Sequence, residues 1–198
     1  FIGTVSPAGG NLKEPVTEST KKAARCFYAL AQASADGKRY PAVDPIDSYS
    51  KYLEYPEIVE HLSKKVSDDW VDKVLRAKNI VRRGKEMAEQ INILGDDGVP
   101  LSYHETFWKS ELIDFIILQQ DAFDKIDSVT PMDRQEYMLT LVLKVCDTAF
   151  KFESFEDCVR LYKEIINVMK QMNYSEFHSE QFNNYLDKLN TILSNGNN

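Results

Sequence analysis

Two aromatic residues, Tyr40 and Phe123, each stand at the centre of a polar, non-helical connection. Burial in a local core is hard to arrange at such positions, because the surrounding residues are polar. Two rings delivered from separate loops could sandwich a planar ligand such as a purine, an arrangement worth about 1 to 3 kcal/mol per stacked base. The residue types therefore indicate a stacking site rather than a site of bond-making chemistry.

Prolines make the first of these connections rigid. Pro41 and Pro45 each fix their own φ and push the preceding residue, Tyr40 or Asp44, towards extended geometry. A ring on a stiffened backbone offers a flat apolar surface at a small entropic cost. The same residues also fit a proline-braced linker whose tyrosine only packs, and the stretch by itself leaves both interpretations open.

Residues for phosphate or metal chemistry do not accompany these rings. The loop SPAGGN at residues 6–11 lacks the Gly-x-x-x-x-Gly-Lys-Ser/Thr pattern that engages phosphate and magnesium, and no other stretch supplies it. His61, His104 and His178 lie in separate segments without an acidic or cysteine partner at ligand spacing. We therefore predict no catalytic residue and no metal site in this chain, which cannot act alone as a P-loop nucleotidase.

Charge and composition exclude several classes of partner. The 198 residues carry a net charge of -7, which argues against general affinity for nucleic acid or anionic lipid. The three cysteines lie far apart, so neither a disulfide framework nor a zinc site is indicated. No apolar run approaches the roughly 18 residues of a membrane span, so no direct membrane insertion is predicted.

Helical patterns dominate the chain after residue 66. The first five residues, FIGTV, are predicted to form a strand, and its lack of a nearby partner indicates a fragment of a longer protein. Helices are predicted over residues 18–35, around Pro56, over 69–94 with an amphipathic face interrupted near Gly84, over 102–119 and 130–151, from Ser154, and over 179–193 before a fraying NGNN end. The fold class is therefore mainly α, with a short α/β lead-in at residues 1–66 and a helical bundle at residues 67–198.

The turn GDDGVP joins two of these helices into an antiparallel hairpin with an acidic tip. Ser102 and Glu105 are predicted to form a capping box at the start of the second helix of the hairpin. Later helix starts are marked by Thr130 with Pro131, as N-cap and first-turn pair, and by Ser154. The tip, residues 95–105, is either a docking surface or a solvated turn.

Short motifs carry a family resemblance along the chain up to about Lys151. In order, they are SPAGG, EPVTEST, CFYAL, SYSKYLE, INILGDD and FIILQQDAFDKID. They resemble the segments SPPGGD, EPVTQ, FWALD, SYSLY, IVQLVGPD and FLQQNAFDEVD of the catalytic A subunit of V-type and archaeal-type rotary ATPases. In sequence, the chain thus resembles the C-terminal part of that subunit.

The resemblance implies a share in ATP synthesis or hydrolysis coupled to proton or sodium transport. Residues 1–66 would be the end of the P-loop nucleotide-binding domain, and residues 67–198 the helical domain that transmits its conformational change to a rotor. ATP or ADP with Mg²⁺ would be bound by the full-length subunit. The phosphate-binding and catalytic residues would precede Phe1, so the fragment alone should be inactive and hold no cofactor.

The resemblance also implies site residues and partners. Carried over by position, Tyr40 and Pro41 would line one side of the adenine pocket, and Ala122 and Phe123 the other. The tip at residues 95–105 would contact the central rotor stalk, and catalysis would occur at an interface with a B subunit. Such a complex lies peripherally on the cytoplasmic side of the membrane.

The chain departs from the family pattern at three points. YPAVDPIDS replaces FPSINWLTS and resembles the related F-type β subunit instead. Asn11 stands where the family has Asp, and Asp121 where it has Asn. The competing interpretation is a freestanding helical interaction module with no nucleotide binding.

Overall fold

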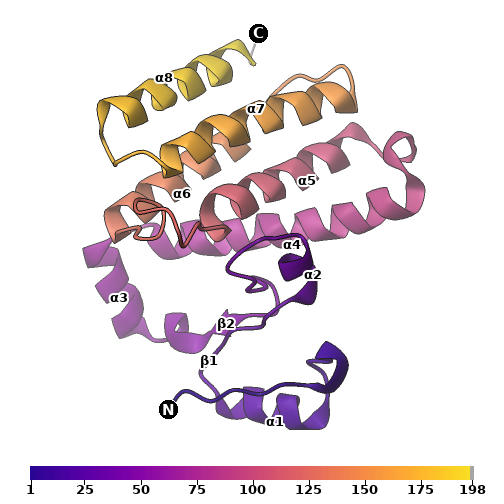
Figure 1. Cartoon of the computed structure of the whole chain (residues 1–198), viewed down its shortest axis with the longest axis vertical. Helices are drawn as coiled ribbons and strands as arrows, with labels where there is room; N and C mark the ends of the chain where they lie inside the picture. Colours follow the sequence, from indigo (N-terminus) through magenta and orange to yellow (C-terminus); the bar gives the residue numbers. More distant parts are fainter. Residues whose placement is uncertain (197–198) are drawn as a thin grey trace.

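The computed structural model describes residues 1–196, so the last two residues of the NGNN end lie outside the described residues. The architecture is mainly helical, as the sequence predicts, with a two-stranded sheet near the N-terminus (Figure 1). The elements in order are η1 (Ala8–Gly10), α1 (Pro15–Ala23), β1 (Cys26–Phe27), α2 (Gln32–Asp36), β2 (Tyr49–Ser50), η2 (Lys51–Glu54), α3 (Pro56–Lys65), α4 (Trp70–Leu94), η3 (Asp96–Gly98), α5 (Leu101–Ile113), the π-helical turn η4 (Asp114–Leu118), α6 (Met132–Asp147), α7 (Phe155–Asn173) and α8 (Glu180–Asn195).

The bundle is built on the hairpin of α4 and α5, which run antiparallel as predicted. Figure 1 shows α7 stacked on α5 and α8 on α7, with the N-terminal segment on the opposite side of α4. α6 contacts both helices of the hairpin. Apolar side chains from α5 to α8 are fully buried between these layers, among them Leu112, Val142, Ile165, Met169 and Phe182. The core therefore lies within the bundle, and the N-terminal segment packs against its outside.

The predicted helix over residues 69–94 is confirmed, and the interruption of its amphipathic face at Gly84 marks the contact with α5. The helix runs continuously from Trp70 to Leu94, and Gly84 lies where α5 passes closest to it. A Cβ atom at this position would stand only 2.0 Å from the Cβ of Ser110 on α5. Glycine is needed here because the two helix backbones approach closely, not because the helix breaks.

The N-terminal segment differs from the prediction in two places. Residues 1–5 form no strand, because no strand in the described part of the chain lies beside them to share backbone hydrogen bonds. The helix predicted over residues 18–35 is divided into α1, β1 and α2. Cys26 and Phe27 of β1 pair antiparallel with Ser50 and Tyr49 of β2. Pairing with a distant segment thus overrides the local helical pattern.

The predicted capping box at the hairpin is wrong. Pro100 is the residue before α5, and Ser102 and Glu105 both lie inside the helix. The carbonyl of Pro100 accepts the N–H of Tyr103 at 2.9 Å, so the first turn of α5 is closed by a backbone hydrogen bond without a side-chain cap. Glu105 instead pairs with Lys109 one turn later, at 2.6 Å.

Of the later caps, one is wrong and one is confirmed. Pro131 is the N-cap residue of α6, so Thr130 does not cap it, and the helix ends before the predicted limit at Lys151. Ser154 caps α7, because its Oγ accepts the backbone N–H of Asp157 at 3.2 Å.

Candidate functional site

Three of the four predicted site residues line one cavity. Tyr40, Ala122 and Phe123 meet at a cavity of about 470 Å³ between the N-terminal segment and the bundle. The side chain of Phe123 is 99% exposed and that of Tyr40 is 55% exposed, so both rings are free to contact a bound molecule. The other lining residues are Lys38, Phe115, Gln119, Gln120, Asp121, Asp127, Lys170, Asn173 and Tyr174. Pro41 faces a neighbouring cavity of about 440 Å³.

Backbone hydrogen bonds hold the two predicted walls together. The N–H of Gln120 donates to the carbonyl of Tyr40 at 2.8 Å, so the two loops are joined directly beside the cavity. The loop that carries Phe123 is closed by Asp127, whose Oδ2 accepts the N–H of Asp121 at 2.6 Å. The N–H of Phe123 then donates to Oδ1 of Asp121 at 2.9 Å. The acids of QQDAFDKID therefore fix the loop geometry, and the ring points outward.

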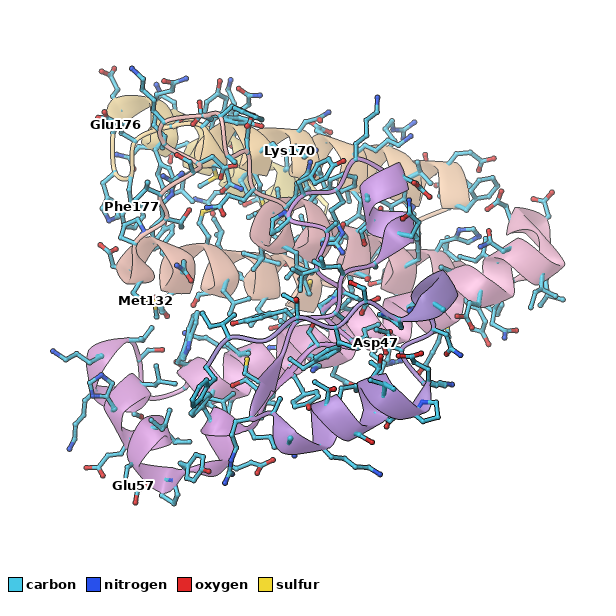
Figure 2. All side chains as sticks on the ribbon, turned by 60° about the horizontal axis from the view of Figure 1, so that its bottom comes forward. Asp47, Glu57, Met132, Lys170, Glu176 and Phe177 are labelled. Atoms are coloured by element: carbon cyan, nitrogen blue, oxygen red, sulfur yellow. The ribbon has the colours of Figure 1, made fainter. Side chains whose placement is uncertain are left out.

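Charged groups of both signs border the cavity. Lys170 on α7, labelled in Figure 2, holds its Nζ 4.1 Å from the ring centre of Phe115, and burial lowers the pKa of this lysine. Lys38 adds a second cation to the lining. Burial raises the pKa of Asp127, and the guanidinium of Arg134 partly opposes that rise. No sequence pattern pointed to Lys170, because this residue belongs to an ordinary amphipathic helix and reaches the site only through the packing of the bundle.

Gln119 is a further polar group that sequence reasoning missed. It lies in the wall shared by the two cavities. Its Oε1 is buried and, among the described residues, has no hydrogen-bond partner. An unmatched buried acceptor costs free energy, so a donor on a molecule in the cavity would be stabilising there. The neighbouring side chain of Gln120 is satisfied, since its Nε2 donates to the carbonyl of Asp127 at 2.7 Å. The doubled glutamine of QQDAF was the available signal.

The tip of the α4–α5 hairpin exposes apolar side chains. Ile93 and Leu94, at the end of α4, are 74% and 55% exposed. Behind them, Nε2 of the buried His104 donates to the carbonyl of Asp96 at 3.1 Å, and its ring stacks on Phe155. This end of the hairpin therefore presents apolar and acidic side chains, and the hydrogen bond from the buried His104 holds its turn.

Metal-ligating and nucleophilic side chains are scattered over the part of the chain that the structure describes. Within it, no three histidine, cysteine or acidic side chains gather as a metal site. Cys146 and Cys158 are buried and free, and burial raises the pKa of each thiol to about 12, so both stay protonated. Over the same residues, no helix has both the length and the apolar character needed to cross a bilayer.

Comparisons with known proteins agree on one family. The family described as "C-terminal domain of V and A type ATP synthase" matches residues 60–159. The V-type ATP synthase alpha chain of Protochlamydia amoebophila (strain UWE25) is 37% identical over 96% of this chain and 32% of its own length. That of Chlamydia abortus is 38% identical over 92% of this chain and 30% of its own length. The chain therefore spans about a third of the length of these curated relatives.

A solved structure supports the fold alone. The ATP synthase subunit NeqB from Nanoarcheaum equitans superposes with a TM-score of 0.50 at 17% sequence identity. The match covers 71% of this chain and 33% of that one.

Proposed function

The chain belongs to the family of C-terminal domains of V- and A-type ATP synthases, and from that premise we propose that it forms part of the adenine-binding wall of the catalytic alpha subunit. One observation carries the proposal: Tyr40 and Phe123, from segments far apart in the sequence, line the same cavity. The whole subunit would bind ATP or ADP with Mg²⁺ at an interface with a B subunit. It would couple ATP synthesis or hydrolysis to proton or sodium transport, as a peripheral subunit on the cytoplasmic side of the membrane.

The residues at the cavity fit a purine base. Two exposed aromatic rings supply stacking surfaces, and Ala122 beside Phe123 leaves room next to the ring. Gln119 lines the cavity, and a rotation of its side chain that brings the buried, unpartnered Oε1 to the cavity would let it accept a hydrogen bond from the exocyclic amino group of adenine. Pro41 faces the neighbouring cavity, so its role would be to hold Tyr40 rather than to touch the base.

The pocket is tested by removing each ring in the full-length subunit within its assembled complex. Tyr40→Ala and Phe123→Ala should each raise the dissociation constant for ATP by about 5- to 150-fold, the effect of losing one stacking partner. Because both rings are exposed in this structure, neither substitution should unfold the bundle. The measurements are equilibrium ATP binding and thermal unfolding of each variant.

Tyr52→Ala provides the matched control, because Tyr52 is also a half-exposed tyrosine of the N-terminal segment but lines neither cavity. Its ATP affinity should be unchanged. If the Tyr40→Ala and Phe123→Ala proteins bind ATP as tightly as the Tyr52→Ala protein, the pocket assignment is wrong. That result would favour the competing interpretation, a helical interaction module without nucleotide binding.

We propose the hairpin tip, residues 95–105, as the surface that meets the central rotor stalk. The supporting observation is the exposure of Ile93 and Leu94, which end α4 immediately before the tip and its two acidic residues, Asp96 and Asp97. Ile93→Ser with Leu94→Ser should lower the number of ions transported per ATP hydrolysed without changing ATP affinity. Leu75→Ser, at an equally exposed leucine near the other end of α4, is the control. Unchanged coupling in the tip variant would contradict this role.

A further inference from the structure

Arg39, the residue before Tyr40, joins the N-terminal segment to the bundle. Its side chain is only 13% exposed, and its Nε lies 3.1 Å from Oδ1 of Asp114, where α5 passes into η4. The guanidinium also donates to Oγ of Ser34 at 2.7 Å and to the carbonyl of Val43 at 3.0 Å. One cation therefore fixes the shape of the loop that carries Tyr40 and ties that loop to the end of α5.

Both walls of the cavity are attached to the same helix end. The N–H of Gln119 donates to the carbonyl of Asp114 at 2.8 Å, which closes the π-helical turn. The next residue, Gln120, donates its N–H to the carbonyl of Tyr40. Phe123 follows three residues later. A displacement of Asp114 would therefore change the spacing of the two aromatic rings.

The other end of α5 lies at the hairpin tip. The helix has 13 residues from Leu101 to Ile113, a rigid span of about 20 Å. Its close approach to α4 at Gly84 leaves little room for the two helices to slide past each other. A push on the tip is thus carried along α5 to Asp114.

We propose that the Arg39–Asp114 ion pair is a positioning latch, which sets the distance between Tyr40 and Phe123 according to the position of the α4–α5 hairpin. The latch rests on the adenine pocket proposed above and adds to it the element through which nucleotide occupancy and the hairpin influence each other. Coupling of this kind is reciprocal: a hairpin position that separates the pair weakens base binding, and a bound base favours the hairpin position that closes the pair.

The surroundings of the latch make the ion pair sensitive to the loss of either partner. Asp114 is 23% exposed at its side chain, so little water is available to replace Arg39. Glu111, one turn earlier on α5, lines the same cavity of about 450 Å³ as Arg39 and Asp114. On the facing loop and on α4, Asp44 and Lys85 also line it, 3.8 Å apart. Removal of one partner would leave the other charge poorly solvated and free to reorient.

A double-mutant cycle in the assembled complex of full-length subunits tests the latch. Asp114→Asn and Arg39→Gln keep much of the side-chain shape and remove the charge attraction. Each should raise the KM for ATP about 10-fold or more, since 10-fold corresponds to the lower end of the coupling measured for close charge pairs, with a smaller change in kcat. The double variant should be no worse than either single variant, because the same interaction is lost. Asp114→Glu, which restores the charge, should recover part of the affinity.

The Arg76–Asp147 ion pair, which joins α4 to α6 at the surface, is the matched control. Arg76→Gln with Asp147→Asn should leave the KM for ATP unchanged. That result would show that the rise in KM comes from loss of the Arg39–Asp114 pair and not from loss of an ion pair in general. Should the Asn variant fail to assemble, Arg39→Lys keeps the charge but loses the guanidinium bonds to Ser34 and Val43, and it should show a smaller rise in KM than Arg39→Gln.

Two results would overturn the latch: wild-type KM in the single variants, or additive losses in the double variant. Failure of the latch and failure of the pocket are distinguishable. If Tyr40→Ala weakens ATP binding and Asp114→Asn does not, the pocket stands and the latch is wrong. If neither substitution changes ATP affinity, both proposals are wrong.

Discussion

Gly84→Ala should lower the free energy of unfolding of this chain by about 3 kcal/mol, the upper part of the usual range for an overpacked core. The added Cβ would lie 2.0 Å from Cβ and 2.5 Å from Oγ of Ser110. A Cβ atom moves only with its backbone, so α4 and α5 would have to separate. In an exposed helix the same substitution stabilises by up to about 1 kcal/mol, so the sign itself is diagnostic. Chemical denaturation measures it.

Ser110→Gly in the Gly84→Ala background removes the atoms that clash. A new glycine in α5 costs about 1 kcal/mol of helix stability. Removal of the clash should restore more than that, so the double variant should be more stable than Gly84→Ala. Equal stability of wild type and Gly84→Ala would show that the two helices can separate freely. That outcome would contradict the rigid hairpin on which the transmission from tip to cavity depends.

Glu111→Gln should stabilise the chain at pH 8 by on the order of 2 kcal/mol. Burial raises the pKa of Glu111 from 4.5 to about 7. The nearby Asp114 carboxylate adds to this rise, and the charge of Arg39 opposes it. Between about pH 4.5 and about pH 7, Glu111 is therefore protonated in the folded state and ionised in the unfolded state. By linkage, the contribution of Glu111 to stability falls as pH rises from about 4.5 to about 7, and glutamine does not titrate. The partly buried side chain keeps some contact with water, which makes the effect smaller than the full shift implies.

Denaturation of wild type and Glu111→Gln at pH 4.5 and pH 8 checks this prediction. The two proteins should be nearly equal at the lower pH and differ at the higher one. Glu86→Gln, at an exposed position of α4, should match wild type at both. A Glu111→Gln protein that is less stable than wild type at pH 8 would mean that the carboxylate is ionised and favourably paired in the fold.

Local signals predicted the bundle well. The long amphipathic pattern of α4, the turn at Gly95 and the cap at Ser154 all depend on residues close together in sequence, and the structure confirms them. The sequence shows the interruption of the amphipathic face near Gly84 but not its cause. The cause is the close approach of Ser110 on α5, which is remote in sequence.

The N-terminal segment could not be predicted in the same way. The apparent helix over residues 18–35 is broken because Cys26 and Phe27 find backbone partners more than twenty residues away. The FIGTV strand is absent because nothing beside it in the described structure can complete its hydrogen bonds. Both outcomes depend on long-range pairing, which local propensity does not contain.

The sequence singled out the aromatic residues that line the cavity but not the polar ones. Tyr40 and Phe123 stood out because apolar rings at the centre of polar loops are conspicuous. Gln119 and Lys170 did not, because glutamine and lysine are ordinary on helices and only the folded arrangement shows which of them border the cavity. Arg39 was hidden for the same reason, since its partner Asp114 is remote in sequence.

Photolabelling with 2-azido-ATP in the assembled complex of full-length subunits is the most direct test of the adenine-wall assignment. The reactive group is carried on the base itself and attaches to the residues that touch it. Label is expected on peptides that contain Tyr40 and Phe123, with both signals suppressed by excess ATP. Label confined to segments outside residues 38–41 and 119–124 would contradict it.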